Sequence, residues 1–287
     1  MPAVTIATLL GSADRVIRLT RSVRDFAGPV AGAPVLCFSP EDAASDPADR
    51  ERIEAAGARV VPFRRAGVPP LPFAAKAAAA AHAESDAGAR LVVWLDDDTL
   101  VVAPPAFVLP DGIALACRPV HHRNIGVPAA EPLDPFWRRV FEVCGVPEGR
   151  DRTMVSHAGE AIHAYLNAGC FAVEARRGLL QAWRDRLAAL PADPVLAEWC
   201  ARSEPHAVFA HQALFTGVML AALGPEEVLE LGPEYNYPLH LHHQVPAECR
   251  PAGLDELVTV RCEDLLDVPR HDLPLLDPLR DWLAETG

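Results

Sequence analysis

The sequence predicts an α/β fold in which a mostly parallel central sheet is flanked by helices. Strand-like and helix-like runs alternate from the start of the chain in the order strand, helix, strand, helix, strand. This order implies right-handed crossovers and therefore a parallel sheet. Residues 92–102 read VVWLDDDTLVV, a run of β-branched and aromatic residues interrupted by three aspartates. A continuous apolar run of this kind is typical of a strand that is buried on both faces.

The first 95 residues are predicted to form the parallel part of the sheet. Ser12 and Asp14 follow the first strand and have side chains suited to cap the next helix. A second helix is predicted to start near residues 39–42 and to end at Gly57, and an alanine-rich helix leads into the central strand. The predicted strands span residues 4–10, 33–38, 59–63 and 91–95, and the predicted helices span residues 15–26, 50–56 and 73–84.

The rest of the chain is less regular and contains two polar loops, at residues 118–126 and 149–160. We find no internal repeat, so we expect a single domain over residues 1–287, with one lobe at 1–110 and a second at 111–287. The predicted strands span residues 113–117, 165–173, 228–231, 237–241 and 257–262, and the predicted helices span residues 134–143, 177–189, 207–223 and 278–284.

Composition excludes several classes of function. The 287 residues are 50% hydrophobic and 23% charged, which is ordinary for a soluble globular protein. A formal net charge of -13 argues against a nucleic-acid partner, because phosphate backbones require a basic surface. The seven cysteines are scattered without a C-x-x-C spacing, which favours thiols in a reducing cytoplasm. No apolar run reaches the ~18 residues of a membrane span, so we expect no integral membrane segment.

Asp96, Asp97 and Asp98 are expected at the carboxyl end of the central strand, where open α/β sheets bind ligands. Three adjacent carboxylates repel one another, so a compact site that holds them needs a positive partner. Mg²⁺ and Mn²⁺ prefer carboxylate oxygens and are often shared with phosphate groups. In an extended segment Asp96 and Asp98 point to the same side, so this pair is predicted to bind a divalent cation. The alternative is a solvated acidic turn.

Three further stretches follow the aspartates in the chain. They are residues 167–169 (NAG) in a strand, residues 211–212 (HQ) in a helix, and residues 235–243 (YNYPLHLHH). With these motifs in this order, residues 4–245 resemble the GT-A fold nucleotide-sugar glycosyltransferases, most closely the retaining, glycogenin-like galactosyltransferase and glucosyltransferase branch. The resemblance implies a nucleotide-binding lobe before the aspartates and a small acceptor-side lobe towards the C-terminus. It also implies a metal-dependent transfer from a nucleoside-diphosphate sugar, with a UDP-sugar as first guess, to a small-molecule or glycan acceptor.

The resemblance further implies roles for individual residues. Asp96 and Asp98 are the implied ligands of Mn²⁺ or Mg²⁺, which would stabilise the departing diphosphate. A late histidine is the third implied ligand. His242 is the first choice and His240 the second, because both share one face of the strand predicted there, whereas His243 faces away. The donor is expected to contact Thr8, Leu9, Ser12, Lys76, Asp97, Arg118 and His121.

Lys76 is the only lysine in the chain. It lies on the helix before the aspartates, where similar transferases place a basic residue near the diphosphate or ribose; the alternative is a surface lysine whose stem covers apolar residues. Arg118 and His121 belong to the polar loop at residues 118–126. We expect this loop to bind an anionic donor group or to shape the acceptor pocket, because loops at the ligand edge of a scaffold commonly carry function. The alternative is a solvated surface loop.

Asn167, Gln212 and His211 are the implied catalytic residues. Asn167 and Gln212 do not titrate, so their expected work is orientation and electrostatic stabilisation of an oxocarbenium-like state. The family pattern has an aspartate where this chain has His211. An inverting reaction needs a base, for which Glu160, His157 and His211 are all candidates.

Two other classes of function compete with this interpretation. Residues 95–99 (LDDDT) also resemble the first motif of haloacid-dehalogenase phosphatases, in which an aspartate is the nucleophile. That motif normally lies on the first strand and needs a downstream lysine, whereas Lys76 lies upstream. The third class is a non-catalytic protein that binds a sugar nucleotide or a metal with the same fold.

Overall fold

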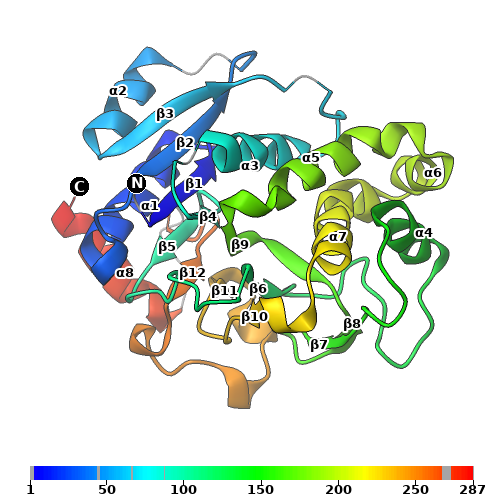
Figure 1. Cartoon of the computed structure of the whole chain (residues 1–287). Helices are drawn as coiled ribbons and strands as arrows, with labels where there is room; N and C mark the ends of the chain where they lie inside the picture. The colour runs from blue at the N-terminus through cyan, green and yellow to red at the C-terminus, as the bar shows by residue number, and fades with distance from the viewer. Residues whose placement is uncertain (1–2, 44–45, 66, 87, 267–272, 287) are drawn as a thin grey trace.

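The structure, a computed structural model, describes residues 3–43, 46–65, 67–86, 88–266 and 273–286. A seven-stranded sheet with the order β10-β6-β9-β4-β1-β2-β3 runs through it (Figure 1). Neighbouring strands are parallel, except that β9 pairs antiparallel with β4 and β6. The predicted mostly parallel sheet is confirmed. Its strands are β1 (Val4–Leu9), β2 (Val35–Pro40), β3 (Ala58–Phe63), β4 (Leu91–Leu95), β6 (Leu115–Pro119), β9 (Leu166–Glu174) and β10 (Val228–Glu230).

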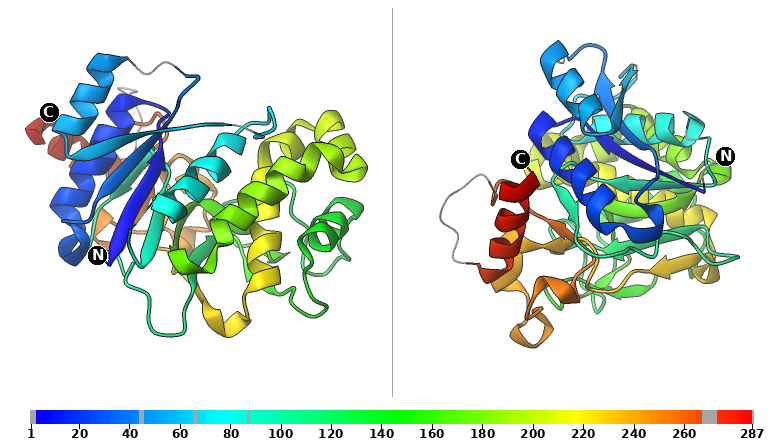
Figure 2. Two further views of the ribbon diagram at one scale, coloured as in Figure 1. Left: turned by 45° about the horizontal axis from the view of Figure 1, so that its top comes forward. Right: turned by 90° about the vertical axis from the view of Figure 1, so that its left-hand side faces the viewer.

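Helices pack on both faces of the sheet (Figure 2). One face is covered by α3, α5 and α7, with α4 and α6 outside them, and the other face is covered by α1 and α2. The C-terminal α8 lies beside α1, where the rings of Phe26 and Trp282 are 5.4 Å apart. The helices are α1 (Ala13–Phe26), α2 (Pro47–Ala55), α3 (Ala74–Asp86), α4 (Pro135–Cys144), α5 (Leu179–Ala189), α6 (Pro194–Arg202), α7 (Glu204–Ala222) and α8 (Asp277–Thr286).

The central strand β4 is buried along its whole length. Its side chains alternate between the two faces: Val92 and Trp94 pack beneath α3, whereas Val93 and Leu95 pack towards α1. Because both faces are covered, every position of the strand is apolar, as the sequence indicated.

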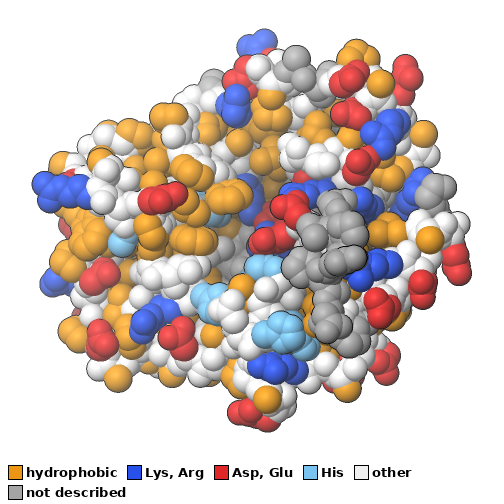
Figure 3. Space-filling view, turned by 180° about the vertical axis from the view of Figure 1, so that it is seen from behind, with side chains coloured by type: hydrophobic (Ala, Val, Ile, Leu, Met, Phe, Trp, Pro, Cys, Tyr) orange, Lys and Arg blue, Asp and Glu red, His pale blue; other side chains and the backbone are white. Residues whose placement is uncertain are grey.

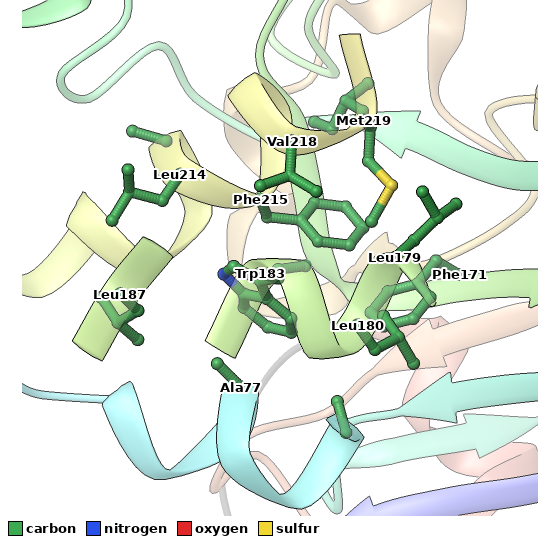
Figure 4. Packing of buried hydrophobic residues seen from close by; sticks show 14 of the residues in the cluster. Ala77, Phe171, Leu179, Leu180, Trp183, Leu187, Leu214, Phe215, Val218 and Met219 are labelled. Carbon is green, nitrogen blue, oxygen red and sulfur yellow. The ribbon is translucent and has the colours of Figure 1, made fainter. Parts of the chain in front are cut away.

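Lys76 lies on α3, and the packing of this helix fixes the position of the lysine. Figure 4 shows Trp183 of α5 between Ala77 of α3 and Phe215 of α7. The Trp183 ring lies 5.0 Å from that of Phe215, and its indole N–H donates to the carbonyl of His211 at 2.7 Å. The small alanine side chains let α3 approach both the sheet and α5, so this helix is held closely against β4.

Two smaller sheets complete the fold. In the first, β12 (Thr259–Arg261) lies between β11 (Tyr237–Pro238) and β5 (Thr99–Val101), and β5 is antiparallel to β12. The second is a hairpin of β7 (Thr153–Val155) and β8 (Ala161–His163). Since β5 follows the three aspartates directly, the first small sheet begins where the central strand ends.

The predicted strand at residues 237–241 is wrong beyond Pro238. Leu239–Gln244 form a 3₁₀ helix instead of continuing β11. Pro238 has no N–H to donate to a strand ladder, so it weakens the pairing at this point. His242 bonds the Tyr237 hydroxyl through Nδ1 at 2.9 Å, a local contact that favours the compact turn. The argument that His240 and His242 share one face of a strand therefore does not apply.

Other predicted boundaries also differ. The helix predicted from residues 39–42 begins at Pro47, because Asp46 accepts from the amide of Ala48 at 2.9 Å and caps the helix there. The predicted loop at 149–160 contains β7, and α6 was not predicted. Strands from both sides of residue 110 belong to one sheet, since β9 inserts between β4 and β6, so the two predicted lobes stay a prediction. None of the helices in the described ranges is long and apolar enough to cross a membrane.

Glu84 provides a test of the packing between α3 and α5. Its buried carboxylate accepts the amides of Leu180 and Gln181 at 3.1 and 3.0 Å, at the N-terminus of α5. We expect Glu84→Ala to lower the free energy of unfolding by about 1–2 kcal/mol, because two helix-end amides lose their acceptor. Urea unfolding measures this. Glu51→Ala, at an exposed position on α2, is the control, and equal effects of the two changes would contradict the prediction.

Candidate active site

The candidate site lies at the edge of the sheet where β1, β4 and β6 end and β9 begins. The three aspartates follow β4 in a turn: the amide of Asp96 donates to Gly169 at 2.9 Å, and the amide of Thr99 donates to Asp96 at 3.0 Å. The prediction that Asp96 and Asp98 point to the same side assumed an extended segment. The segment is instead a turn. Each carboxylate instead has its own partners from a different part of the chain.

Asp96 pairs with Lys76. The lysine Nζ lies 2.7 Å from the carboxylate oxygens, and the indole N–H of Trp94 donates to the same carboxylate at 3.0 Å. Lys76 is only 6% exposed, so the alternative of a surface lysine is wrong. The contact brings Lys76 to the aspartates, and its role towards a donor stays a prediction.

Asp97 binds the beginning of α1. Its Oδ2 accepts the amides of Gly11 and Ser12 at 3.0 and 2.9 Å, whereas the Ser12 side chain makes no capping bond. The predicted capping by Ser12 is therefore wrong, because the carboxylate of Asp97 takes that place. Burial raises the pKa of Asp97 to about 6, against the opposing hydrogen bond from Ser12.

Asp98 pairs with Arg261. Arg261 ends β12, whose antiparallel register with β5 places it opposite Thr99. Its Nη2 and Nε donate to Asp98 Oδ2 at 2.7 and 3.2 Å. Burial raises the pKa of Asp98, but the charge and hydrogen bonds of Arg261, together with the charges of Lys76 and Arg15, hold that pKa below its usual value. The sequence analysis did not single out Arg261; the available signal was an arginine that closes the apolar run at residues 257–260.

Asn167 and Gln212 lie next to this turn. Asn167 Oδ1 accepts the amide of Gly169 at 2.7 Å, and Gln212 Oε1 accepts the amide of Ala168 at 3.1 Å. A Cβ atom on Gly169 would lie 2.8 Å from Asp96 Oδ2 and 3.0 Å from Asn167 Oδ1. The structure therefore brings Asn167, Gln212 and Asp96 together around one glycine.

His211 precedes Gln212 on α7 and is buried. Its Nδ1 lies 2.8 Å from the carbonyl of Val208, and its ring lies 5.5 Å from that of Phe73. Burial, followed by the charge of Lys76, lowers the pKa of His211 to about 3. This histidine is therefore neutral at physiological pH.

Arg118 and His121 belong to a buried cluster that includes His157 and Asn236. Arg118 donates to the carbonyl of Leu231 at 2.9 Å and lies 3.2 Å from His157 Nδ1. His121 Nε2 lies 2.8 Å from the carbonyl of Asn236. Burial lowers the pKa of Arg118 to about 10 and that of His157 to about 3, and it also lowers the pKa of His121.

A cavity of about 370 Å³ adjoins this cluster and is lined in part by Arg118, His157 and Tyr237. Figure 3 shows a hollow on the face turned away from the viewer of Figure 1, where basic, acidic and histidine side chains gather. Thr8 and Leu9 lie at the end of β1, and the buried Oγ1 of Thr8 has no hydrogen-bond partner within the described residues. Glu160 is exposed.

The residues predicted to bind a metal do not fit a cation as they are placed. Lys76 and Arg261 already engage the carboxylates of Asp96 and Asp98, and His242 bonds Tyr237. His240 Nε2 lies 3.3 Å from Glu263. Over the described ranges, no group of three or more His, Cys, Asp or Glu side chains is arranged to hold a metal ion.

Comparisons with known proteins show the family and the fold. Residues 15–207 match the model of the Rhodobacterales glycosyltransferase domain. Two crystal structures of the galactosyltransferase LgtC are similar over 99% of this chain and 95% of that chain: an active-site glutamine-to-glutamate mutant (14% identity, TM-score 0.53) and a complex with donor and acceptor sugar analogues (15% identity, TM-score 0.52). The predicted GT-A fold is thus confirmed. A search of curated protein sequences gave no match.

The contact between Gly11 and Asp97 can be tested by substitution. A Cβ atom on Gly11 would lie 2.7 Å from Asp97 Oδ2, so we expect Gly11→Ala to lower the free energy of unfolding by about 1–2 kcal/mol through loss of the amide contacts. Gly32→Ala is the control, because no atom lies within 4 Å of the added methyl group. In an Asp97→Ala background Gly11→Ala should cost little. Additive effects in this double-mutant cycle would refute the prediction.

Proposed function

We propose that the donor is a nucleoside-diphosphate sugar, with a UDP-sugar as the first candidate. The premise is that the chain belongs to the Rhodobacterales glycosyltransferase domain family. The protein is a glycosyltransferase with the GT-A fold. Its acceptor is proposed to be a small molecule or a glycan. The LgtC complex contains both a donor and an acceptor sugar analogue, and this supports the same two-substrate arrangement here.

The observation that carries the donor proposal is the pair of cations beside the aspartates. Lys76 and Arg261 reach Asp96 and Asp98 at the sheet edge where α/β folds bind ligands. The chain as a whole has a net charge of -13, and Lys76 and Arg261 offset the charges of Asp96 and Asp98, so a diphosphate at this edge does not face two uncompensated carboxylates. The proposed role of the two side chains is to stabilise the charge that develops on the departing diphosphate.

The nucleoside is proposed to lie at the end of β1, against Thr8, Leu9 and Ser12. The unpartnered hydroxyl of Thr8 supports this placement, because a buried polar atom needs a hydrogen bond. Asp97 is less suited to bind ribose, since its carboxylate already accepts the amides of Gly11 and Ser12. Its proposed role is to hold the start of α1 in place.

The transferred sugar is proposed to lie against Asn167 and Gln212. The carbonyl oxygen of each side chain accepts a backbone amide, which fixes the orientation of the amide group. Neutral dipoles that are oriented before the reaction stabilise an oxocarbenium-like state at little reorganisation cost. The acceptor is proposed to approach from the side of Arg118 and His121.

Retention of configuration is part of the proposal, and inversion is the alternative. Inversion needs a base whose pKa is close to the working pH. Burial lowers the pKa of His157 and of His211 to about 3, which makes both histidines weak bases, and Glu160 is exposed. These properties favour retention. Proton NMR of the first product tests this proposal, because retention gives a product with the anomeric configuration of the donor and inversion gives the opposite one.

Mn²⁺ or Mg²⁺ stays a prediction from the sequence. The carboxylates of Asp96 and Asp98 are paired with Lys76 and Arg261 instead of being open to a metal ion. The proposed roles are therefore assigned to the protein's own side chains. A cytoplasmic location is also proposed, because Cys37, Cys117 and Cys170 are buried free thiols. The family membership disfavours the phosphatase alternative and the non-catalytic alternative.

A panel of sugar nucleotides tests the donor class. We expect slow release of the free nucleoside diphosphate from at least one of the UDP-, GDP-, ADP-, CDP- and dTDP-sugars, because water can replace the acceptor when none is supplied. Release is measured by a coupled nucleotide assay, with and without Mn²⁺. Absence of release from all donors under both conditions would reject the proposal.

Gln212 tests the placement of the sugar. We expect Gln212→Ala to lower kcat by about 10²- to 10³-fold with little change in KM, because an oriented dipole next to the reacting carbon is lost. Steady-state kinetics with the donor found in the panel measure both constants. Gln244→Ala, at an exposed position of the 3₁₀ helix, should behave as the unchanged protein. A large rise in KM alone would place Gln212 in ground-state binding instead.

A further inference from the structure

We infer that the guanidinium of Arg261 takes the place of the divalent cation that the family resemblance implies, so that this glycosyltransferase binds the donor diphosphate without metal. The inference rests on the proposed nucleoside-diphosphate donor and adds the identity of the positive group that contacts it. It is an alternative to the sequence-based prediction in which Asp96, Asp98 and a late histidine hold Mn²⁺ or Mg²⁺.

The first argument is the position of Arg261. The antiparallel register of β12 with β5 sets it opposite Thr99, directly after the aspartates. The side chain of Asp98 is 5% exposed, whereas that of Arg261 is 21% exposed. The guanidinium therefore lies between the buried carboxylate and solvent. A ligand that approaches Asp98 from solvent meets Arg261 first.

The second argument is that both carboxylates are already paired with cations. Both oxygens of Asp98 contact Arg261, at 3.3 Å from Nε to Oδ1 and 2.7 Å from Nη2 to Oδ2. Both oxygens of Asp96 contact Lys76 at 2.7 Å. An arginine keeps its charge at all accessible pH values, so it cannot leave by deprotonation. A metal ion at Asp98 would have to displace the guanidinium and then remain beside it, with two like-signed charges in a partly buried site.

The third argument is the location of the histidines. Beyond Pro238 the chain turns into a 3₁₀ helix, where His242 bonds the Tyr237 hydroxyl at 2.9 Å. His240 contacts Glu263 rather than an aspartate of the turn. Nδ1 of His242 and Nε2 of His240 thus contact Tyr237 and Glu263, while Arg261 occupies the strand end that faces Asp98.

The fourth argument is the donor capacity that Arg261 retains. A guanidinium has five N–H groups, and Asp98 engages those on Nε and Nη2. Within the described part of the chain, no hydrogen bond from Nη1 is formed. The two contacts of Asp98, to Nε and Nη2, orient the group, and Glu263 lies 3.9 Å from Nη2. The remaining N–H groups are suited to phosphate oxygens, which arginine binds in a bidentate manner.

Calorimetry tests this inference. UDP, GDP, ADP, CDP and dTDP are titrated into the full-length protein in EDTA and again in Mn²⁺, and Mn²⁺ alone is titrated with detection of the free ion by electron paramagnetic resonance. We expect the preferred nucleotide to bind in EDTA with an affinity within about threefold of that in Mn²⁺, and no stoichiometric Mn²⁺ binding. Binding that requires Mn²⁺ would overturn the inference and leave the donor proposal intact. Absence of binding by all five nucleotides under both conditions would overturn both.

Variants of Arg261 add a second measurement. In EDTA, Arg261→Met should weaken nucleotide binding at least about tenfold, since a charge-assisted contact to phosphate is lost, and Arg261→Lys should restore part of it. Arg202→Met, which removes an exposed arginine on α6, is the matched control. Circular dichroism shows whether each variant folds; should Arg261→Met fail to fold, Arg261→Lys and the metal titration of the unchanged protein decide the question. Unaltered binding by folded Arg261→Met would contradict the role of this residue.

Discussion

The rest of the site depends on one electrostatic constraint, the placement of three consecutive, buried or half-buried carboxylates at the end of β4. Carboxylates so close together repel one another and lose hydration, so each needs its own compensating partner. Lys76 on α3 compensates Asp96, the amides at the start of α1 compensate Asp97, and Arg261 on β12 compensates Asp98. Three separate parts of the chain therefore converge on one turn.

This convergence links the two lobes. The turn lies between β4 and β5, so it joins the main sheet to the small sheet that contains β12. Lys76 is positioned because α3 packs against the sheet and α5, and Arg261 is positioned because β12 pairs with β5. The positive groups are thus held by packed elements and not by loops. Groups fixed in this way need little reorganisation when charge develops on a ligand.

Features that depend on neighbouring residues could be predicted from the sequence, whereas contacts between distant residues could not. The buried strand β4 and the place of the aspartates were predictable, because periodicity and burial are local properties of the sequence. The strand at residues 237–241 was not, because the alternation of leucine and histidine imitates a half-buried strand while Pro238 interrupts the ladder. Lys76 stood out as the only lysine, whereas the only local signal for Arg261 was its place at the end of the run at residues 257–260, which does not identify its partner.

The sequence by itself determined the alternation of strands and helices, the mostly parallel sheet, and an acidic turn at its carboxyl edge, since these depend on neighbouring residues. Only the tertiary structure decided which cation meets which aspartate. Asp98 and Arg261 are 163 positions apart, and their contact depends on the pairing of β5 with β12. The 3₁₀ helix after Pro238 likewise sets His242 against the Tyr237 hydroxyl. The partners of these side chains depend on the folded arrangement of the chain, which the local sequence pattern does not reveal.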